Sequence, residues 1–320
     1  MKVAVTGANG FVGAALVRRL AADGHEVSAC VRALPSGGAE RWPGGTRVVA
    51  VGDIHGSTDW TCALEGVSVV VHAAARVHVM RETADDALSA FRQVNVAGTV
   101  NLARQAAAAG VRRMVLVSSV KVLGESTAQG RPFTEKDQPA PQDAYARSKL
   151  EAEEGLRQVA AETGMEWVVV RPPLVYGPGV RANFEAMMRW LQRGLPFPFG
   201  LVTENRRSLV GLDNLVDLLV VCTQHPNVPG HRLLVSDGDD LSTAELLTRL
   251  GRAMHRPARL LPVPLVCLKW GAAVMGRRAM AQRLLGSLEV DIAATQRVTG
   301  WCPAVPVEEG LRRAAIREIP

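Results

Sequence analysis

A glycine-rich turn near the start of the chain constrains its fold more than any other feature. The turn covers residues 6–13 (Thr-Gly-Ala-Asn-Gly-Phe-Val-Gly), follows the apolar run 3–5 and leads into a stretch of helical character from Ala14 onward. This order makes a cradle for pyrophosphate, because glycine lets the backbone turn tightly and approach phosphate, while the first helical amides point at the anion. Dinucleotide contacts are therefore expected from Gly7, Asn9, Gly10, Phe11, Val12 and Gly13.

The second expected strand, residues 26–31, bears on which dinucleotide binds. In NAD-binding units a carboxylate at the tip of this strand holds the ribose 2′-hydroxyl. Here the strand ends on Val31 and Arg32 without an acid, and its Glu26 lies at the opposite end. A carboxylate would repel a 2′-phosphate, whereas an arginine fork can bind one bidentately. We therefore expect NADP(H), with Arg32 at the 2′-phosphate, and keep NAD(H) as the alternative.

The charge balance favours small anionic ligands over nucleic acid. The 320 residues include 37 Lys and Arg against 31 Asp and Glu, for a net charge of +6, and 48% of them are hydrophobic, which is enough for a large core. The positive charges are scattered as arginine pairs such as Arg112-Arg113, with no basic block interleaved with aromatic residues. We therefore expect no nucleic-acid partner.

The cysteine pattern and the apolar runs indicate the cellular compartment in which the protein is expected. The five cysteines are scattered without a Cys-x-x-Cys spacing, at Cys30, Cys62, Cys222, Cys267 and Cys302. This predicts neither disulfides nor a metal site and is typical of the cytoplasm. Because the sequence runs straight into a strand, no signal peptide is expected. The longest apolar stretch, residues 260–275, contains Pro262, Pro264 and Lys269, so we expect an amphipathic core helix there and no integral membrane segment.

Apolar strand-like runs alternate with helical stretches through the first half of the chain. The expected strands are residues 3–6, 26–31, 47–51, 67–72, 113–118 and 166–171, and the expected helices include 95–109 and 143–163. This alternation predicts an α/β fold with a Rossmann-type, doubly wound parallel sheet. Residues 1–172 are expected to form the NAD(P)-binding domain with the catalytic residues. Residues 173–320, where prolines and glycines break the pattern, are expected to form a smaller, mostly helical substrate region interleaved with the last sheet strands. The long segment 123–141 between them predicts a surface loop that lines the site.

Tyr145 and Lys149 are four residues apart at the start of an expected helix and so share one helix face. An ammonium at roughly 5 Å stabilises a phenolate by about 3 kcal/mol at an effective dielectric of about 20. We therefore expect the pKa of Tyr145 to fall from its usual value near ~10 by about two units, toward the range of acid–base catalysis. Ser118 and Ser119 end the fifth strand, at the edge where open α/β sheets bind ligands.

Taken in order, these motifs resemble the extended short-chain dehydrogenase/reductase family, in particular its nucleotide-sugar epimerase/dehydratase branch. The matching segments extend over nearly the whole chain: residues 6–13, 52–54, 72–75, 95–99, 118–119, 145–149, 171–179 and 299–303. The resemblance implies that Ser119 holds the substrate oxygen and that Tyr145 transfers the proton. It also implies that Lys149 tunes Tyr145 and holds the nicotinamide ribose.

Further contacts are implied by the same resemblance. Asp53 and Ile54 are expected at the adenine, and other cofactor contacts from Ala73, Ala74, Ala75, Asn95, Pro172 and Val175. Contacts to a UDP-sugar substrate are expected from His78, Ser119, Val120, Lys121, Asn183, Arg207 and Arg283. Family members commonly form homodimers through the helices that correspond to 95–109 and 143–163, and a monomer is equally consistent with this sequence.

Three reactions share this scaffold in the family. Dehydratases follow the catalytic hydroxyl with an Asp-Glu pair, whereas Val120 and Lys121 follow Ser119 here, which argues against dehydration. Epimerases oxidise and re-reduce a sugar C4 hydroxyl and usually hold NAD, while 4-ketoreductases use an exchangeable NADPH. Because Val31-Arg32 lacks an acid, and segment 119–125 resembles such reductases, we expect NADPH-dependent reduction of a UDP-linked 4-keto-6-deoxy-N-acetylhexosamine for surface polysaccharide. An NAD-dependent UDP-hexose or UDP-hexosamine 4-epimerase is the alternative.

The sequence leaves two other functional classes open. Some members of this fold have lost catalysis and act as regulators, but those typically lack the tyrosine–lysine pair that is present here. Others reduce lipophilic alcohols or ketones, often with NADPH. Asn183 and Arg207 favour a phosphorylated ligand over such lipophilic substrates.

Overall fold

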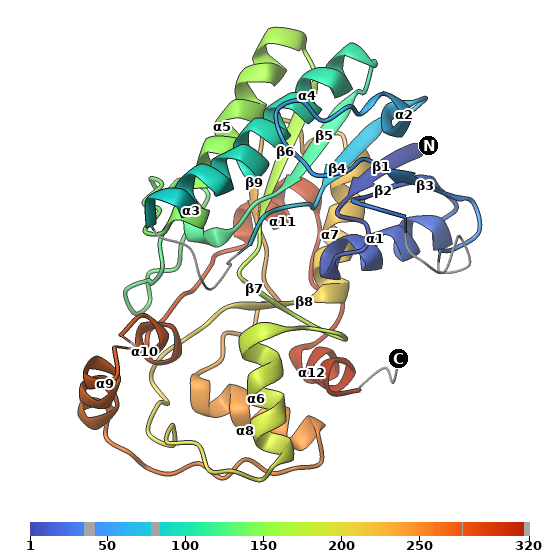
Figure 1. Ribbon diagram of the computed structural model, residues 1–320. Coiled ribbons are helices and arrows are strands. Elements are labelled where there is room, and N and C mark those ends of the chain that lie inside the picture. Colours follow the sequence, from blue (N-terminus) through green and yellow to red (C-terminus); the bar gives the residue numbers. More distant parts are fainter. Residues whose placement is uncertain (35–41, 78–83, 277, 317–320) are drawn as a thin grey trace.

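A seven-stranded parallel sheet forms the centre of the chain, in the order β3-β2-β1-β4-β5-β6-β9 (Figure 1). The computed structural model describes residues 1–34, 42–77, 84–276 and 278–316. The strands of this sheet are β1 (Lys2–Thr6), β2 (Glu26–Val31), β3 (Thr46–Ala50), β4 (Val69–His72), β5 (Arg113–Val117), β6 (Glu166–Arg171) and β9 (Arg232–Leu234). The predicted doubly wound fold and its six strands are confirmed to within two residues at each end. The seventh, β9, has only three residues and gave no readable pattern.

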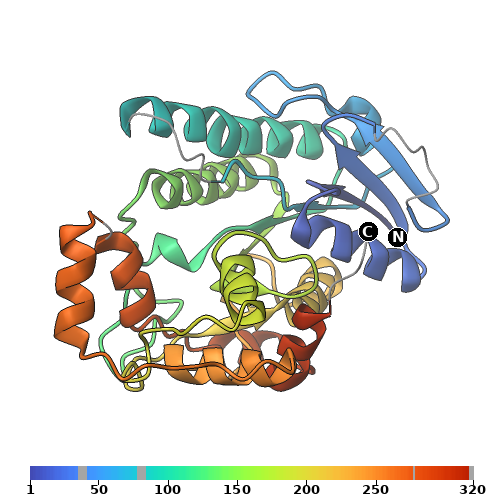
Figure 2. The same cartoon turned by 60° about the horizontal axis from the view of Figure 1, so that its bottom comes forward.

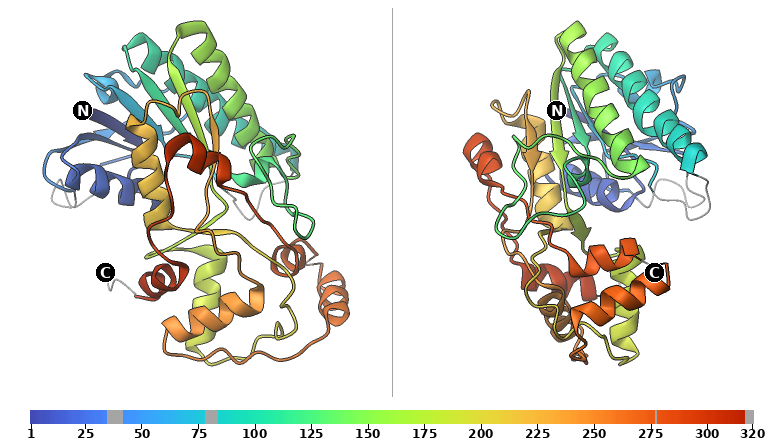
Figure 3. Two further views of the ribbon diagram at one scale, coloured as in Figure 1. Left: turned by 180° about the vertical axis from the view of Figure 1, so that it is seen from behind. Right: turned by 90° about the vertical axis from the view of Figure 1, so that its left-hand side faces the viewer.

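Helices cover both faces of the sheet. Figure 3 shows α4 (Gly98–Ala108) and α5 (Ala144–Thr163) on one face, and α1 (Phe11–Ala22), α7 (Leu212–Gln224) and α11 (Ala293–Thr299) on the other. A short α2 (Thr61–Leu64) packs beside β2. Strand alternation divides the core between the faces: Val3 and Val5 join the cluster under α1 and α7, whereas Ala4 joins the cluster under α4 and α5.

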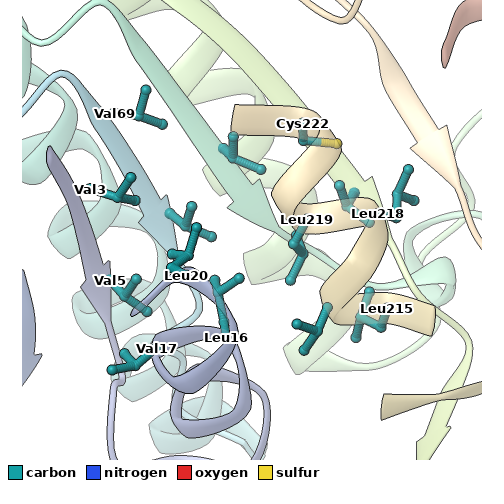
Figure 4. Close-up of a cluster of buried hydrophobic side chains, with 14 of the residues drawn as sticks. Val3, Val5, Leu16, Val17, Leu20, Val69, Leu215, Leu218, Leu219 and Cys222 are labelled. Atoms are coloured by element: carbon teal, nitrogen blue, oxygen red, sulfur yellow. The ribbon is translucent and has the colours of Figure 1, made fainter. Parts of the chain in front are cut away.

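The core between the sheet, α1 and α7 holds the first strand and its glycine turn in place. Figure 4 shows Val3 and Val5 on β1 beside Leu16 and Leu20 on α1, with Leu219 of α7 facing them. All five side chains are fully buried. Burial of each such side chain contributes about 1.5–3 kcal/mol. The glycine turn therefore connects two elements that are fixed by packing.

The helix predicted at 95–109 begins much earlier than expected. A continuous helical path runs through α3 (Ala84–Phe91), the π-helical segment η2 (Arg92–Ala97) and α4. A π turn adds one residue to the helical repeat, so its apolar spacing departs from the 3.6-residue pattern by which helices are recognised in a sequence. Such turns are frequent at functional sites, and this one contains Asn95.

A second layer of structure lies beyond the carboxyl ends of the strands (Figure 1). It contains the two-stranded sheet β7 (Leu174–Tyr176) and β8 (Leu209–Gly211) with α6 (Ala182–Gln192), α8 (Thr243–Ala253) and α12 (Val307–Ala315). Between β8 and α8 the chain returns to the large sheet as α7 and β9. We therefore propose that residues 1–172 and 173–320 are two interleaved regions rather than separable ones.

The prediction of a core helix within residues 260–275 is wrong about its burial. Residues 265–274 form α9 (Leu265–Val274), but this helix has no buried residue. It packs mainly against α10 (Arg278–Leu285) and forms with it a hairpin at one corner of the molecule (Figure 2). Apolar composition predicted the helix correctly, but composition does not specify which surface covers it. Among the described residues, no helix has the length and apolar character to cross a membrane.

Candidate active site

The glycine turn packs directly against the segment that follows β4. Gly7 has φ +64°, and a Cβ built on it would lie 2.9 Å from the Ala74 backbone. A Cβ on Gly13 would lie 2.1 Å from the Gly7 carbonyl oxygen, so neither position accommodates a side chain. Gly10 precedes α1 and has no side chain to cap its first amides, which include those of Phe11 and Val12. The turn is therefore shaped for an anion such as a pyrophosphate.

An exposed ion pair occupies the position expected for the adenosine end of a dinucleotide. Arg32 Nε lies 2.8 Å from Asp53 Oδ1, and both side chains are more than three-quarters exposed. Thus Arg32, expected at a 2′-phosphate, is paired with the acid expected at the adenine. The next residue, Ile54, packs over α4 at Gly98, where an added Cβ would lie 2.4 Å from Ile54 Cγ2.

A cavity of about 330 Å³ lies beside the glycine turn on the side of Arg18 and Arg181. It is lined by Asn9, Ala14, Arg18, Val31, Ala33, Trp42, Pro43 and Arg181. The indole Nε1 of Trp42 has no hydrogen-bond partner in the described part of the chain. The cavity therefore offers two guanidinium groups and an unused donor, a donor set that suits an anion. The sequence did not predict that Arg18 and Arg181 line the same cavity, because they are 163 positions apart.

A directional hydrogen-bond chain links the ends of β1 and β4 to the π turn. Ala74 N donates to Thr6 Oγ1 (3.2 Å), and Thr6 Oγ1 lies 2.6 Å from His72 Nδ1. On the other side His72 Nε2 lies 3.1 Å from Thr99 Oγ1, which itself donates to Asn95 O at 2.6 Å. Because Thr99 gives its proton to Asn95, it accepts from His72, which fixes the proton on Nε2. Burial lowers the pKa of His72 to about 3, and Lys149 acts in the same direction, so the ring stays neutral.

Asn95 joins three segments of the site. Its Oδ1 accepts from Arg76 N at 2.8 Å, and its Nδ2 donates to Arg76 O at 3.2 Å and to Ser148 Oγ at 2.9 Å. Ser148 Oγ in turn donates to Tyr145 O at 2.7 Å. The predicted cofactor residue Asn95 therefore connects the segment after β4, which includes Ala73, Ala74 and Ala75, to the start of α5.

Tyr145 and Lys149 lie in the first turns of α5, where Asp143 is the N-cap and its Oδ1 accepts from Ala146 N at 2.7 Å. The Tyr145 ring meets Phe91 edge-on at 6.0 Å between centroids. Lys149 is fully buried, with 1% of its surface exposed. The shared helix start predicted from the sequence is confirmed.

The predicted downward shift of the Tyr145 pKa is wrong for the protein chain by itself. Burial raises the pKa of Tyr145 to about 12, and the Asp143 carboxylate acts in the same direction. Burial lowers the pKa of Lys149 to about 8, while the Glu153 carboxylate partly offsets this. Loss of water disfavours the charged form of both groups, and it outweighs the attraction between phenolate and ammonium on which the expectation was based.

The two serines at the end of β5 have different partners. Ser118 is buried, and its Oγ donates to Glu153 Oε1 at 2.5 Å. The same carboxylate accepts from Arg171 Nε at 3.0 Å and Nη2 at 2.6 Å, with both side chains buried. Ser119 is half-buried, and its Oγ accepts from Lys121 N at 3.3 Å. That bond uses a lone pair, so the Ser119 hydroxyl keeps a proton to donate.

Charged side chains gather where the loop after β5 meets the α9–α10 hairpin. Lys121 Nζ binds Glu125 Oε1 at 2.6 Å and Asp143 Oδ2 at 2.8 Å, and Arg283 Nε lies 3.7 Å from Glu125 Oε2. Arg207 Nη1 donates to Gly286 O at 3.2 Å. Burial lowers the pKa of Arg207, the Glu125 carboxylate raises it, and Arg283 lowers it. The structure thus brings Lys121, Arg207 and Arg283 to one cluster, with Glu125 as an acid that the sequence did not single out.

The remaining predicted residues border this region or lie outside the described residues. Val120 begins the short 3-10 turn η3 (Val120–Val122), and its N donates to Pro172 O at 3.0 Å. Val175 lies in β7 and is half-buried. Asn183 is in the first turn of α6, but its side chain is outside the described part of the structure, as is the whole of His78. No group of three or more His, Cys, Asp or Glu suited to a metal occurs among the described residues.

Comparisons with known proteins agree with this arrangement. The model of the NAD dependent epimerase/dehydratase family matches residues 3–235. A Vibrio cholerae protein named UDP-glucose 4-epimerase is 44% identical over 313 residues, covering 98% of this chain and 94% of its own length. The solved structure of MoeE5 in complex with UDP-glucose and NAD has a TM-score of 0.77 at 26% identity and covers 98% of this chain and 97% of that one. A UDP-glucose 4-epimerase structure from Thermotoga maritima has a TM-score of 0.76 at 21% identity, with 98% and 97% covered.

Proposed function

Because the chain belongs to the NAD dependent epimerase/dehydratase family, we propose that it is a nucleotide-sugar 4-epimerase that oxidises and re-reduces C4 of a UDP-hexose or UDP-hexosamine. The observation that carries this proposal is the half-buried Tyr145 and the buried Lys149 on one face of α5, together with a glycine turn shaped for pyrophosphate. The 44% identity to the Vibrio cholerae protein named UDP-glucose 4-epimerase, over nearly both whole chains, supports the choice of reaction.

The residues present fit a nicotinamide dinucleotide. Gly7 and Gly13 leave a cradle that any side chain would fill, and the amides at the start of α1 would hold the pyrophosphate. Asp53 and Ile54 would border the adenine, and Ala74, Asn95 and Lys149 the nicotinamide half. When bound, the nicotinamide supplies the hydride acceptor and donor for C4.

Tyr145 would exchange the proton of the C4 hydroxyl, and Ser119 would donate a hydrogen bond to the same oxygen. Lys149, with a pKa of about 8, is mostly charged at neutral pH and stabilises the tyrosine in its deprotonated form. Glu153 and Arg171 position the helix face that carries Lys149 without contacting the reacting atoms. Arg207 and Arg283 would hold the diphosphate of the UDP-sugar, as guanidinium groups do.

An NADPH-dependent 4-ketoreductase is the second candidate, and one observation favours it. The tip of β2 lacks an acid, and the neighbouring cavity is lined by Arg18 and Arg181 with an unpaired Trp42 donor, which suits a 2′-phosphate. Against it, the Arg32 expected at that phosphate is paired with Asp53. The solved structure of MoeE5 contains NAD.

The test is to incubate the purified protein with UDP-glucose, UDP-galactose and their N-acetylhexosamine analogues, with NAD or without added cofactor, and to separate the C4 epimers. We expect one pair to interconvert to the same equilibrium from either side, and the Tyr145→Phe variant to leave both sugars unchanged. No interconversion, together with NADPH consumption on a UDP-4-keto-6-deoxyhexosamine, would replace the epimerase with the reductase.

A further inference from the structure

The helix α9 is apolar on nearly all sides and yet lies on the surface. Apart from Lys269, residues 265–274 carry no charge, and a helix of that composition normally lies in a core or at a membrane. Here Val266 is 76% exposed, Trp270 71% and Val274 69%, at successive four-residue spacings along one face. Met275, just past the helix, is 65% exposed. This is an unpartnered apolar face.

The segment of the chain that contains α9 carries a strong net positive charge. Residues 246–288 contain eight Arg and Lys and no Asp or Glu, so this segment has a net charge of +8, while the other residues sum to −2. The exposed members include Arg252 in the last turn of α8, Arg256 and Arg259 on the connection that runs along the lower edge of the molecule to α9 (Figure 1), and Lys269 on α9 itself. The apolar face therefore belongs to a segment of net positive charge, in which Arg249 is paired with Asp239 and Glu308 and Arg283 lies near Glu125.

We propose that the α9–α10 hairpin docks on the surface of an anionic lipid bilayer, with the apolar face of α9 in the interface. Tryptophan and aliphatic side chains flanked by arginine and lysine are the composition of interfacial helices. Ten residues give a helix of about 15 Å, which is long enough to lie in the headgroup region and too short to cross the hydrocarbon.

Charge complementarity favours a bilayer over a second copy of the chain. A twofold dimer through this face would place the same positive segment opposite itself, so each copy would repel the other. Anionic headgroups instead attract basic residues near the surface, and this attraction is screened by salt. The proposed catalytic residues Ser119, Tyr145 and Lys149 lie outside the hairpin, whereas Arg283, proposed at the diphosphate of the substrate, lies on α10.

The experiment is sedimentation of the full-length protein with vesicles of phosphatidylcholine alone or mixed with phosphatidylglycerol, at low and high salt. We expect binding only to the phosphatidylglycerol vesicles, lost at high salt. The Val266→Ser/Trp270→Ser and Arg259→Glu/Lys269→Glu variants should each bind at least about tenfold more weakly. The controls Ile316→Ser and Arg104→Glu/Arg297→Glu change exposed residues elsewhere and should bind as the unmodified protein does.

Epimerase turnover of each variant on UDP-sugar in solution shows whether the variant is folded. If the protein has no epimerase activity, thermal unfolding of each variant shows this instead. Equal binding to both kinds of vesicle, or equal weakening by the control variants, would overturn the proposal. So would absence of vesicle binding. If the protein does not bind vesicles but forms a dimer that the Val266→Ser/Trp270→Ser substitutions dissociate, a second copy of the chain covers the face. If it binds no vesicles and stays monomeric, neither lipid nor a second copy covers the face.

Discussion

The two tyrosines of the chain, Tyr145 and Tyr176, lie at two different junctions of the fold and have different neighbours. At the junction of the sheet with the C-terminal helices, Tyr176 Oη donates to Asp237 Oδ2 at 2.7 Å, and Asn214 Nδ2 and Gly211 N donate to the same carboxylate. At the edge of β5 and α5, Tyr145 is instead grouped with the lysine Lys149. Burial raises the pKa of both phenols. A carboxylate opposes ionisation of each phenol, Asp143 for Tyr145 and Asp237 for Tyr176. The difference is that Tyr176 donates its hydrogen bond to that carboxylate, whereas the ammonium of Lys149, one helical turn from Tyr145, can support ionisation of Tyr145.

The Tyr176 side chain is closely packed on several sides. A Cβ on Gly310 of α12 would lie 2.6 Å from Tyr176 Oη, and the Tyr176 ring stacks on Phe184 at 5.7 Å. The phenol thus ties β7, α6 and α12 together and contacts no open cavity that the structure describes. We infer that Tyr176 serves stability and that Tyr145 serves chemistry.

The largest expected effect separates the two tyrosines by activity. Tyr145→Phe should lower kcat by roughly 10³-fold or more, because proton transfer at the C4 oxygen loses its acid–base group. The variant should still bind nicotinamide dinucleotide and unfold at the temperature of the unmodified protein. Steady-state kinetics and a thermal melt measure this. Activity within tenfold of the unmodified protein would refute the role of Tyr145.

The next effect concerns the buried carboxylate that positions Lys149. Glu153→Gln should lower the free energy of unfolding by about 3–5 kcal/mol, because the Arg171 guanidinium would stay buried without its counter-charge. The control is Glu151→Gln on the same helix, whose exposed ion pair with Arg92 should be worth about 1 kcal/mol or less. Urea unfolding measures both, and equal losses would contradict the positioning network.

The pH dependence of stability tests whether Lys149 is desolvated. The pKa of Lys149 in the folded chain, about 8, lies below its usual 10.5, so between these values the unfolded chain binds more protons. Stability conferred by this group therefore rises with pH from about 8 to 10.5, by on the order of 2 kcal/mol. In Lys149→Met this rise should disappear, whereas Lys136→Met, an exposed control, should retain it. The same slope in all three proteins would show that Lys149 is not desolvated.

The smallest effect is expected at the other junction. Tyr176→Phe should lower the free energy of unfolding by about 1–3 kcal/mol, because Asp237 loses one of its donors in a buried site, and kcat should change by less than about threefold. Parallel melts and kinetics with Tyr145→Phe give the comparison directly. A Tyr176→Phe variant as inactive as Tyr145→Phe would remove the distinction between the two junctions.

Much of this was predictable from the sequence, for physical reasons that differ between residues. The glycine turn and the strands were readable because a parallel sheet buries both faces of each strand and so leaves continuous apolar runs such as residues 69–71. The spacing of Tyr145 and Lys149 was readable because helices bring residues four apart together.

Other features depend on contacts between distant parts of the chain. The division of roles between Ser118 and Ser119 depends on Glu153 and Arg171. The position of the proton on the His72 ring depends on Thr6 and Thr99, and its neutral state depends on burial. The direction of the Tyr145 pKa depends on desolvation, which a sequence does not report. The exposure of α9 likewise depends on what else packs beside it.

In the proposed reaction, which Tyr145 serves, the hydrogen at C4 of a UDP-sugar is removed and returned to the same carbon. The most direct test is to incubate UDP-hexose deuterated at C4 with the protein and NAD and to examine the recovered epimers by mass spectrometry and NMR. We expect the C4 epimer to form with its deuterium retained at C4, and we expect no epimer to form with the Tyr145→Phe variant. An unchanged UDP-hexose under conditions where NADPH reduces a 4-keto sugar, or an epimer that has lost its deuterium, would contradict the proposed reaction.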